Sequence, residues 1–183
     1  MLIALALLDD VPIMTIAFDN ASVPPQPVKW ELDRVLVISS VLGLLGVIQS
    51  FGLLYLGDTL HHLDHSHLQT MMFLQLVAGG HLMLFVTRTR GVFWKPPYPS
   101  SKLFFAIVAT QIVAVLMCSQ GWLVPALPWR IIGFVWGYNL GWMIVQDVVK
   151  LGIYGILDPG HSWKKSLFQP LRVSIASPPQ ALR

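Results

Sequence analysis

Residues 35–57, VLVISSVLGLLGVIQSFGLLYLG, form an apolar stretch without a charged side chain. A helix needs about 20 residues to cross the hydrocarbon layer of a bilayer, about 30 Å thick, because each residue rises about 1.5 Å. This stretch therefore predicts a membrane span. The composition agrees, since 55% of the 183 residues are hydrophobic and only 11% are charged. Soluble domains carry about a quarter charged residues, and disordered chains are polar, so both classes are excluded.

Three further stretches approach or pass the same test: residues 68–87, 103–129 and 131–157. In the second of these, Pro125 and Pro128 indicate that the helix ends near Val124. Residues 1–18 form a shorter apolar stretch that lacks the basic start of a signal peptide and contains two acids. We therefore expect an all-α, polytopic transmembrane helix bundle with four full spans and a truncated N-terminal span.

The basic residues predict the orientation of the chain. Ten of the twelve Lys and Arg residues lie in residues 19–34, in residues 88–102 and after residue 158. Loops rich in Lys and Arg face the cytoplasm, so these connections and the C-terminus are expected there. The net charge of +3 is then a topology signal, and we expect no nucleic acid as partner. Residues 1–160 are predicted as the membrane domain, and residues 161–183 as a short, disordered cytoplasmic tail.

Asp9 and Asp10 are adjacent carboxyl groups in an apolar stretch, LALLDDVPIMTI. A carboxylate near the bilayer centre costs at least about 2.5 kcal/mol, so such residues usually face a bundle interior and serve ion or proton pathways. The two are not expected to be ionised together. Pro12 cannot donate to the carbonyl of Leu8 and is expected to unwind that turn, freeing a possible cation ligand. Alternatively, the acids lie near a helix end and pair with a basic residue elsewhere.

At these residues the sequence resembles a known family. Residues 8–16, LDDVPIMTI, with Asp19 and a Pro-rich turn to Trp30, are similar to the sixth transmembrane helix and following loop of the P-type proton-pumping ATPases of plasma membranes. The usual form there is Leu-Asn-Asp, two variable residues, then Ile-Met-Thr-Ile. The resemblance extends to about residue 160. It implies the C-terminal transmembrane half of such a pump, helices six to ten.

Two later stretches carry the same resemblance. Residues 74–75 and 85–90, LQ and FVTRTR, look like the eighth helix and its basic exit. Trp136, followed by Asp147 and Lys150, looks like the tenth helix. The matches occur in the order that the family has.

Carried over by position, Asp10 matches the carboxylate that takes up and releases the transported proton. Asp9 stands where the family usually has Asn, which leaves open whether the pair shares one proton or Asp9 tunes Asp10. The resemblance implies the plasma membrane as location, protons and membrane lipids as partners, and Mg-ATP as cofactor of the complete pump. We expect no cofactor and no metal in this chain.

The Asp-Lys-Thr-Gly-Thr phosphorylation motif of the family does not occur in the sequence. We therefore expect that this chain alone does not hydrolyse ATP, and that its partner is the N-terminal half of the pump, with its cytoplasmic domains and first five helices. Two alternatives are a truncated or split-gene membrane protein without transport of its own, and a divalent-cation pump fragment in which Asp9 and Asp10 bind the metal.

Other polar residues have competing interpretations. Four histidines, His61, His62, His65 and His67, flank Asp64 in one connection, which fits a metal site, a pH-responsive loop or a merely polar surface. His81, after two glycines, favours helix packing over proton relay, and Gln75 reads similarly. Asp147 and Lys150, spaced i and i+3, predict a structural ion pair, with Lys150 snorkelling toward the cytoplasmic boundary. An ion-path role for this pair is the alternative.

Overall fold

The computed structural model describes residues 1–20, 32–96 and 98–157, with the side chains of Arg34, His61 and Leu157 excepted. Within these residues all regular secondary structure is helical, which confirms the predicted class. The helices are α1 (Leu2–Thr15), the 3-10 helix η1 (Ile16–Phe18), α2 (Leu32–His61), α3 (His65–Thr87), α4 (Ser101–Gln120) and α5 (Trp129–Leu157). The expected disorder of residues 161–183 lies outside the described residues.

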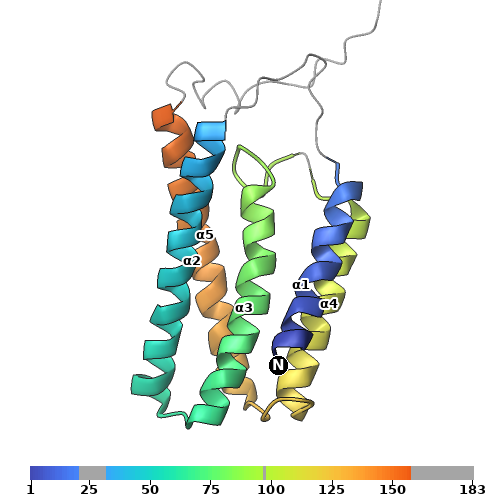
Figure 1. Cartoon of the computed structure of the whole chain (residues 1–183), viewed down its shortest axis with the longest axis vertical. Helices are drawn as coiled ribbons and strands as arrows, with labels where there is room; N and C mark the ends of the chain where they lie inside the picture. The colour runs from blue at the N-terminus through green and yellow to red at the C-terminus, as the bar shows by residue number, and fades with distance from the viewer. Residues whose placement is uncertain (21–31, 97, 158–183) are drawn as a thin grey trace, which may run out of the picture.

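The five α-helices run alternately up and down along one common direction (Figure 1). The α2, α3 and α4 helices are long and apolar enough to cross a membrane. At 14 residues, α1 reaches only about 21 Å at 1.5 Å per residue, in keeping with the predicted short first span. The α5 helix has 29 residues, which is long enough for a span, and it contains Asp147 and Lys150. Among the described residues it is not one of the helices that are both long and apolar enough to cross a membrane.

The α3 helix is the centre of the bundle, because it packs against α1, α2, α4 and α5. Its two-glycine segment and small side chains allow this close approach. The apolar core lies around its first half, where Met71, Leu74 and Val77 are fully buried. Leu8 of α1 and Val135 of α5 reach the same core. Any polar side chain on α3 is therefore close to another helix.

The turn between α4 and α5 corrects one sequence-based expectation. We expected α4 to end near Val124, but it ends at Gln120. Gly121 adopts φ +76°, and its N–H and that of Trp122 both donate to the Met117 carbonyl at 3.0 Å. A glycine in the left-handed region terminates a helix efficiently. The prolines downstream shape the turn rather than end the helix.

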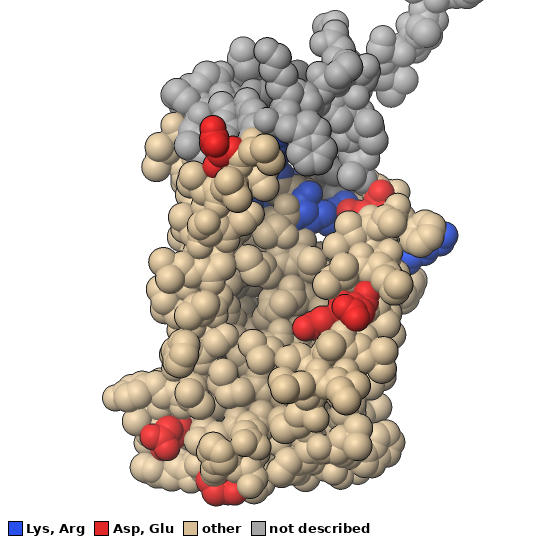
Figure 2. Space-filling view, viewed as in Figure 1, with Lys and Arg blue, Asp and Glu red and all other residues tan. Residues whose placement is uncertain are grey.

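Charged residues are unequally distributed between the two ends of the bundle. In Figure 2 the visible Lys and Arg side chains lie toward the end that carries the α3–α4 connection, whereas acidic side chains are visible at both ends. That connection contains Arg88, Arg90 and Lys95. The opposite end holds Asp58 and Asp64. One end of the bundle is thus markedly more basic.

The Gly121 conformation predicts a stability difference between two glycine substitutions. Gly121→Ala would force a Cβ to 3.2 Å from the Ala126 side chain while keeping the left-handed φ, so we expect a loss of about 1–2 kcal/mol. Gly133→Ala is the matched control, because a Cβ there meets nothing within 4 Å, and it should stabilise α5 by up to about 1 kcal/mol. Thermal unfolding in detergent measures both. Equal effects would contradict this account of the turn.

Candidate functional site: polar residues inside the bundle

The two acids of α1 lie on different faces of the helix. Successive residues are about 100° apart around a helix, and here Leu8 and Pro12 are buried while Asp10 is exposed. Asp9 lies between these faces, with its side chain 34% exposed. Figure 2 shows an acidic patch over α1, away from both ends of the bundle, and Asp9 and Asp10 are the acidic residues of this helix.

Asp9 points toward α3. Its Oδ1 atom lies 3.5 Å from Nε2 of His81, a side chain that is 1% exposed. Oδ1 is buried, and among the described residues it has no hydrogen bond within normal limits. Gly80 lies beside this contact, at a distance where a Cβ would make only ordinary van der Waals contact with Oδ1, 4.0 Å away. Asp10 makes no hydrogen bond or ion pair within the described part of the chain.

Pro12 does not unwind α1, so that expectation was wrong. The helix continues to Thr15 and then tightens into η1. Proline leaves the Leu8 carbonyl without its helical donor, and Pro12 itself is buried within the continuing helix. At the end of α1 the Thr15 hydroxyl donates to the Pro12 carbonyl at 2.8 Å.

His81 also contacts α4. The Gln111 Nε2 atom lies 2.6 Å from Nδ1 of His81 and donates to the Val77 carbonyl at 3.1 Å. One imidazole therefore joins α1, α3 and α4. The sequence-based preference for a packing role agrees with the full burial of His81, while its contact with Asp9 could not be read from spacing.

A second polar cluster, which we call the amide network, joins α2, α3 and α5. Asn139 donates to Gln75 Oε1 at 2.7 Å and accepts from Gln49 Nε2 at 2.8 Å. Gln146 then donates to Gln49 Oε1 at 2.9 Å. All four side chains are at most 3% exposed. Sequence reasoning singled out Gln75 alone, although the other three are also isolated amides in apolar helices, a signal that would have found them.

Gly79 makes room for the amide network. A Cβ at this position would lie 3.1 Å from Asn139 Oδ1 and 3.4 Å from Gln75 Nε2. The first of these distances is shorter than an ordinary van der Waals contact, so a side chain at this position would press on Asn139. Gly79 therefore serves the amide network.

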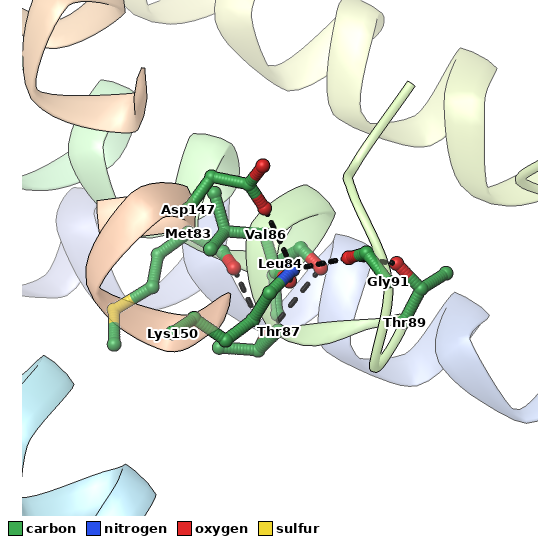
Figure 3. Close-up of polar contacts among 8 residues, drawn as sticks. All are labelled: Met83, Leu84, Val86, Thr87, Thr89, Gly91, Asp147 and Lys150. Carbon is green, nitrogen blue, oxygen red and sulfur yellow. Dashed lines mark hydrogen bonds and ion pairs between the residues drawn. The ribbon is translucent and has the colours of Figure 1, made fainter. Parts of the chain in front are cut away.

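Lys150 and Asp147 are brought together, with Nζ 2.7 Å from Oδ1. Lys150 does not snorkel, which corrects our expectation, since its side chain is 1% exposed. Its Nζ also donates to the carbonyls of Val86 at 2.8 Å and Gly91 at 2.7 Å (Figure 3). An ammonium group has three donors, and here each has an acceptor. The lysine stays inside because the end of α3 offers these two carbonyls.

Asp19 holds the end of η1 to the α3–α4 connection. Its carboxylate pairs with the Arg88 guanidinium and accepts from the Ser100 backbone N–H at 2.9 Å. Burial acts to raise the pKa of Asp19, but the hydrogen bonds from Ser100 and Arg88 outweigh it and keep the pKa below its ordinary value. Ser100 in turn caps α4 by accepting from the Leu103 N–H.

The histidine-rich connection shows local pairs. Asp64 contacts His67, and this hydrogen bond lowers the pKa of the Asp64 carboxyl group. His65 lies 3.1 Å from Gln69, and the His61 side chain lies outside the described residues. In the part of the chain that the structure describes, no three His, Cys, Asp or Glu side chains are grouped to hold a metal ion. A pH-responsive role for this loop stays a prediction.

The helices and their buried polar contacts define an integral membrane protein that keeps polar chemistry inside a helical bundle. No protein-family model matches the chain. It is 39% identical over 151 residues, 82% of this chain and 19% of the relative, to a Methanocaldococcus jannaschii protein named "Putative cation-transporting ATPase". It is 31% identical to "Plasma membrane ATPase 2" of Saccharomyces cerevisiae, over 85% of this chain and 15% of the relative.

A third relative is "Plasma membrane ATPase 1" of Schizosaccharomyces pombe, 29% identical over 91% of this chain and 18% of the relative. The homologues of the chain are thus P-type plasma-membrane ATPases and a cation-transporting ATPase, as the sequence of residues 8–16 predicted. The chain spans less than a fifth of the length of these relatives.

The buried lysine predicts a non-additive pair of substitutions. Lys150→Met leaves the Asp147 carboxylate buried without a countercharge, so we expect a loss of about 3–5 kcal/mol of unfolding free energy. The double variant Asp147→Leu/Lys150→Met should recover part of this loss, because it removes the charge although the Val86 and Gly91 carbonyls keep no donor. Chemical unfolding in detergent measures both, with exposed Arg90→Met as a neutral control. A double variant less stable than Lys150→Met would contradict the ion pair.

The Asp19 contact predicts pH-dependent stability. A carboxyl group whose pKa is lower in the folded state contributes stability above its unfolded pKa, near 3.9, and this contribution is lost as the pH falls through the folded pKa. Asp19→Asn should therefore lower the unfolding temperature at neutral pH, and its difference from the unmodified chain should narrow below about pH 4. Exposed Asp58→Asn is the control. A difference that is constant with pH would remove Asp19 from this role.

Proposed function

We propose that this chain is the membrane part of an ATP-driven cation pump, that the transported ion is a proton, and that Asp10 binds it. The observation that carries the proposal is the position of Asp10 on an otherwise apolar face of α1. Ile3, Leu7 and Met14, at helical spacing from Asp10, are 87%, 66% and 74% exposed. A carboxylate facing lipid at this depth is costly. This face is therefore expected to meet water or protein when the pump works.

We infer that the face of α1 that carries Asp10 packs against the rest of the pump. The curated relatives are more than five times longer than the matched region, so the partner proposed for α1 is the N-terminal half, with the first five helices and the cytoplasmic domains. Mg-ATP would be bound and hydrolysed there. Conformational changes in that half would alter the surroundings of Asp10, which supplies the alternating affinity that a pump requires.

The distribution of charge supports an orientation with the basic end in the cytoplasm. Arg88, Arg90 and Lys95 lie in the connection at that end, and short loops rich in Lys and Arg remain cytoplasmic. The α5 helix ends at the same end of the bundle (Figure 1). We therefore propose that the C-terminal segment is cytoplasmic and that the complete pump resides in the plasma membrane, as the names of the relatives suggest.

The geometry of α1 favours a proton over a divalent metal ion. Calcium takes six to eight oxygen ligands, and magnesium requires near-octahedral geometry. Asp9 and Asp10 lie on different faces of α1, and His81 approaches only Asp9 of the two. Within the described residues, no three His, Cys, Asp or Glu side chains are grouped to hold a metal ion. A proton needs a single carboxylate oxygen. The Leu-Asp-Asp and Ile-Met-Thr-Ile sequence on this helix adds the family resemblance to the same conclusion.

Substitution of each acid in the complete pump tests the proposal. Asp10→Asn should abolish ATP-driven acidification of proteoliposomes, because an amide side chain does not take up and release a proton near neutral pH. Asp9→Asn restores the residue that the family usually has and is the matched control, so it should keep pumping. Dye quenching measures acidification, and phosphate release measures hydrolysis.

Three outcomes would contradict parts of the proposal. Normal acidification by the Asp10→Asn pump would remove Asp10 from transport. ATPase activity that depends on a divalent ion beyond the Mg²⁺ of ATP would identify a metal as the transported ion. If the coding sequence adjoining this chain lacks the phosphorylation motif in any frame, the chain would be a split or truncated membrane protein without transport of its own.

A further inference from the structure

His81 is a buried imidazole with both ring nitrogens facing named polar groups. Its Nδ1 lies 2.6 Å from Gln111 Nε2 of α4, and its Nε2 lies 3.5 Å from Asp9 Oδ1 of α1. Among the described residues, neither His81 Nε2 nor Asp9 Oδ1 has a hydrogen bond within normal limits. The side chain is 1% exposed, so bulk water does not decide its hydrogen bonding. The orientation of Gln111 does.

The contacts of Gln111 determine which nitrogen of His81 carries the hydrogen. The Val77 carbonyl can only accept, so the Gln111 atom that bonds to it at 3.1 Å must be the amide nitrogen. The same nitrogen faces Nδ1 of His81 and can supply its second hydrogen there. Nδ1 is then an acceptor, and the neutral imidazole carries its hydrogen on Nε2. That N–H faces Asp9.

We propose that His81 is a positioning residue for Asp9: Gln111 holds the imidazole in the Nε2–H tautomer, and this N–H is directed at the Asp9 carboxylate across the α1–α3 contact. The inference deepens the proposed function and rests on it, because it assigns α3 and α4 a role in holding Asp9, the neighbour of the proposed ion-binding Asp10. A separation of 3.5 Å is long for a hydrogen bond. Such contacts often shorten in the working complex.

The position of Asp10 makes the proposal specific. Asp10 is exposed on α1, whereas Asp9 and Gln111 are the polar side chains that face the ring nitrogens of His81 among the described residues. A merely packed histidine would have no reason to distinguish between two adjacent acids. A positioning histidine responds to Asp9 and not to Asp10.

Solid-state NMR of the whole chain in lipid nanodiscs, with ¹⁵N in the histidine rings, tests this directly. His81→Gln assigns the signals of His81 by their loss. We expect one tautomer, with the hydrogen on Nε2. Asp9→Asn should shift the Nε2 signal of His81. The same substitution at the neighbouring position, Asp10→Asn, should leave that signal unchanged. Gln111→Met, of similar volume, should cause loss of the single tautomer, because Nδ1 then has no donor.

The result that would overturn the proposal is a hydrogen on Nδ1, or an equal response of His81 to Asp9→Asn and Asp10→Asn. These measurements need no transport, so they separate the two proposals. If Asp10→Asn abolishes pumping while the His81 Nε2 signal does not change in Asp9→Asn, the proposed function stands and this inference fails. If His81 responds to Asp9 while the Asp10→Asn pump works normally, the contact is real and the proposed function fails.

A second measurement uses the complete pump. His81→Gln places an amide N–H near the position of Nε2, whereas His81→Met has no donor. We expect the apparent ion affinity of the ATPase activity to be close to normal in His81→Gln. In His81→Met it should change by about tenfold or more, which corresponds to the loss of one hydrogen bond to a charged group. Equal affinities in both variants would contradict a positioning role.

Discussion

A bilayer interior offers no water, so every polar group inside it must find its partner within the protein. This constraint explains the arrangement of the bundle better than apolar packing does, since lipid chains are as apolar as leucine. The α3 helix meets the constraint on each side with a different neighbour. Gln75 bonds to Asn139 of α5, and His81 contacts Gln111 of α4 and Asp9 of α1. The polar contacts of α3 therefore specify which helix lies on which side of it.

The ends of the bundle obey the same constraint through charge. Lys150, fully buried, uses its three donors on Asp147, on the Val86 carbonyl in the last turn of α3 and on the Gly91 carbonyl in the connection that follows. Asp19 accepts from Arg88 and from the backbone N–H of Ser100, the last residue of the α3–α4 connection. Both ionic contacts hold the α3–α4 connection, one from α5 and one from η1. The connection is thereby fixed from two directions at the basic end of the bundle.

Much of this fold followed from the sequence, because uncharged stretches of span length admit few alternatives. Helix ends were less predictable. Pro125 and Pro128 predicted an end of α4 near Val124, but the left-handed Gly121 ends the helix earlier. The partners of isolated polar residues could not be predicted either. Periodicity places Asp147 beside Lys150 on one helix, but it cannot tell that Val86 and Gly91 will draw Lys150 inward. Such contacts depend on how separate helices align, which local sequence does not encode.

The most informative of these contacts lies where proline interrupts the hydrogen bonding of α1. Pro12 leaves the Leu8 carbonyl without its helical donor, and the helix continues nonetheless. One residue further along, the Asp9 carboxylate faces Nε2 of His81, an imidazole atom that has no hydrogen bond among the described residues. At 3.5 Å the contact is incomplete on both sides, since Asp9 Oδ1 also has no partner there. A buried donor and a buried acceptor that each lack a partner gain free energy by closing on one another, so a small shift of α1 against α3 would change how Asp9 is held beside the exposed Asp10.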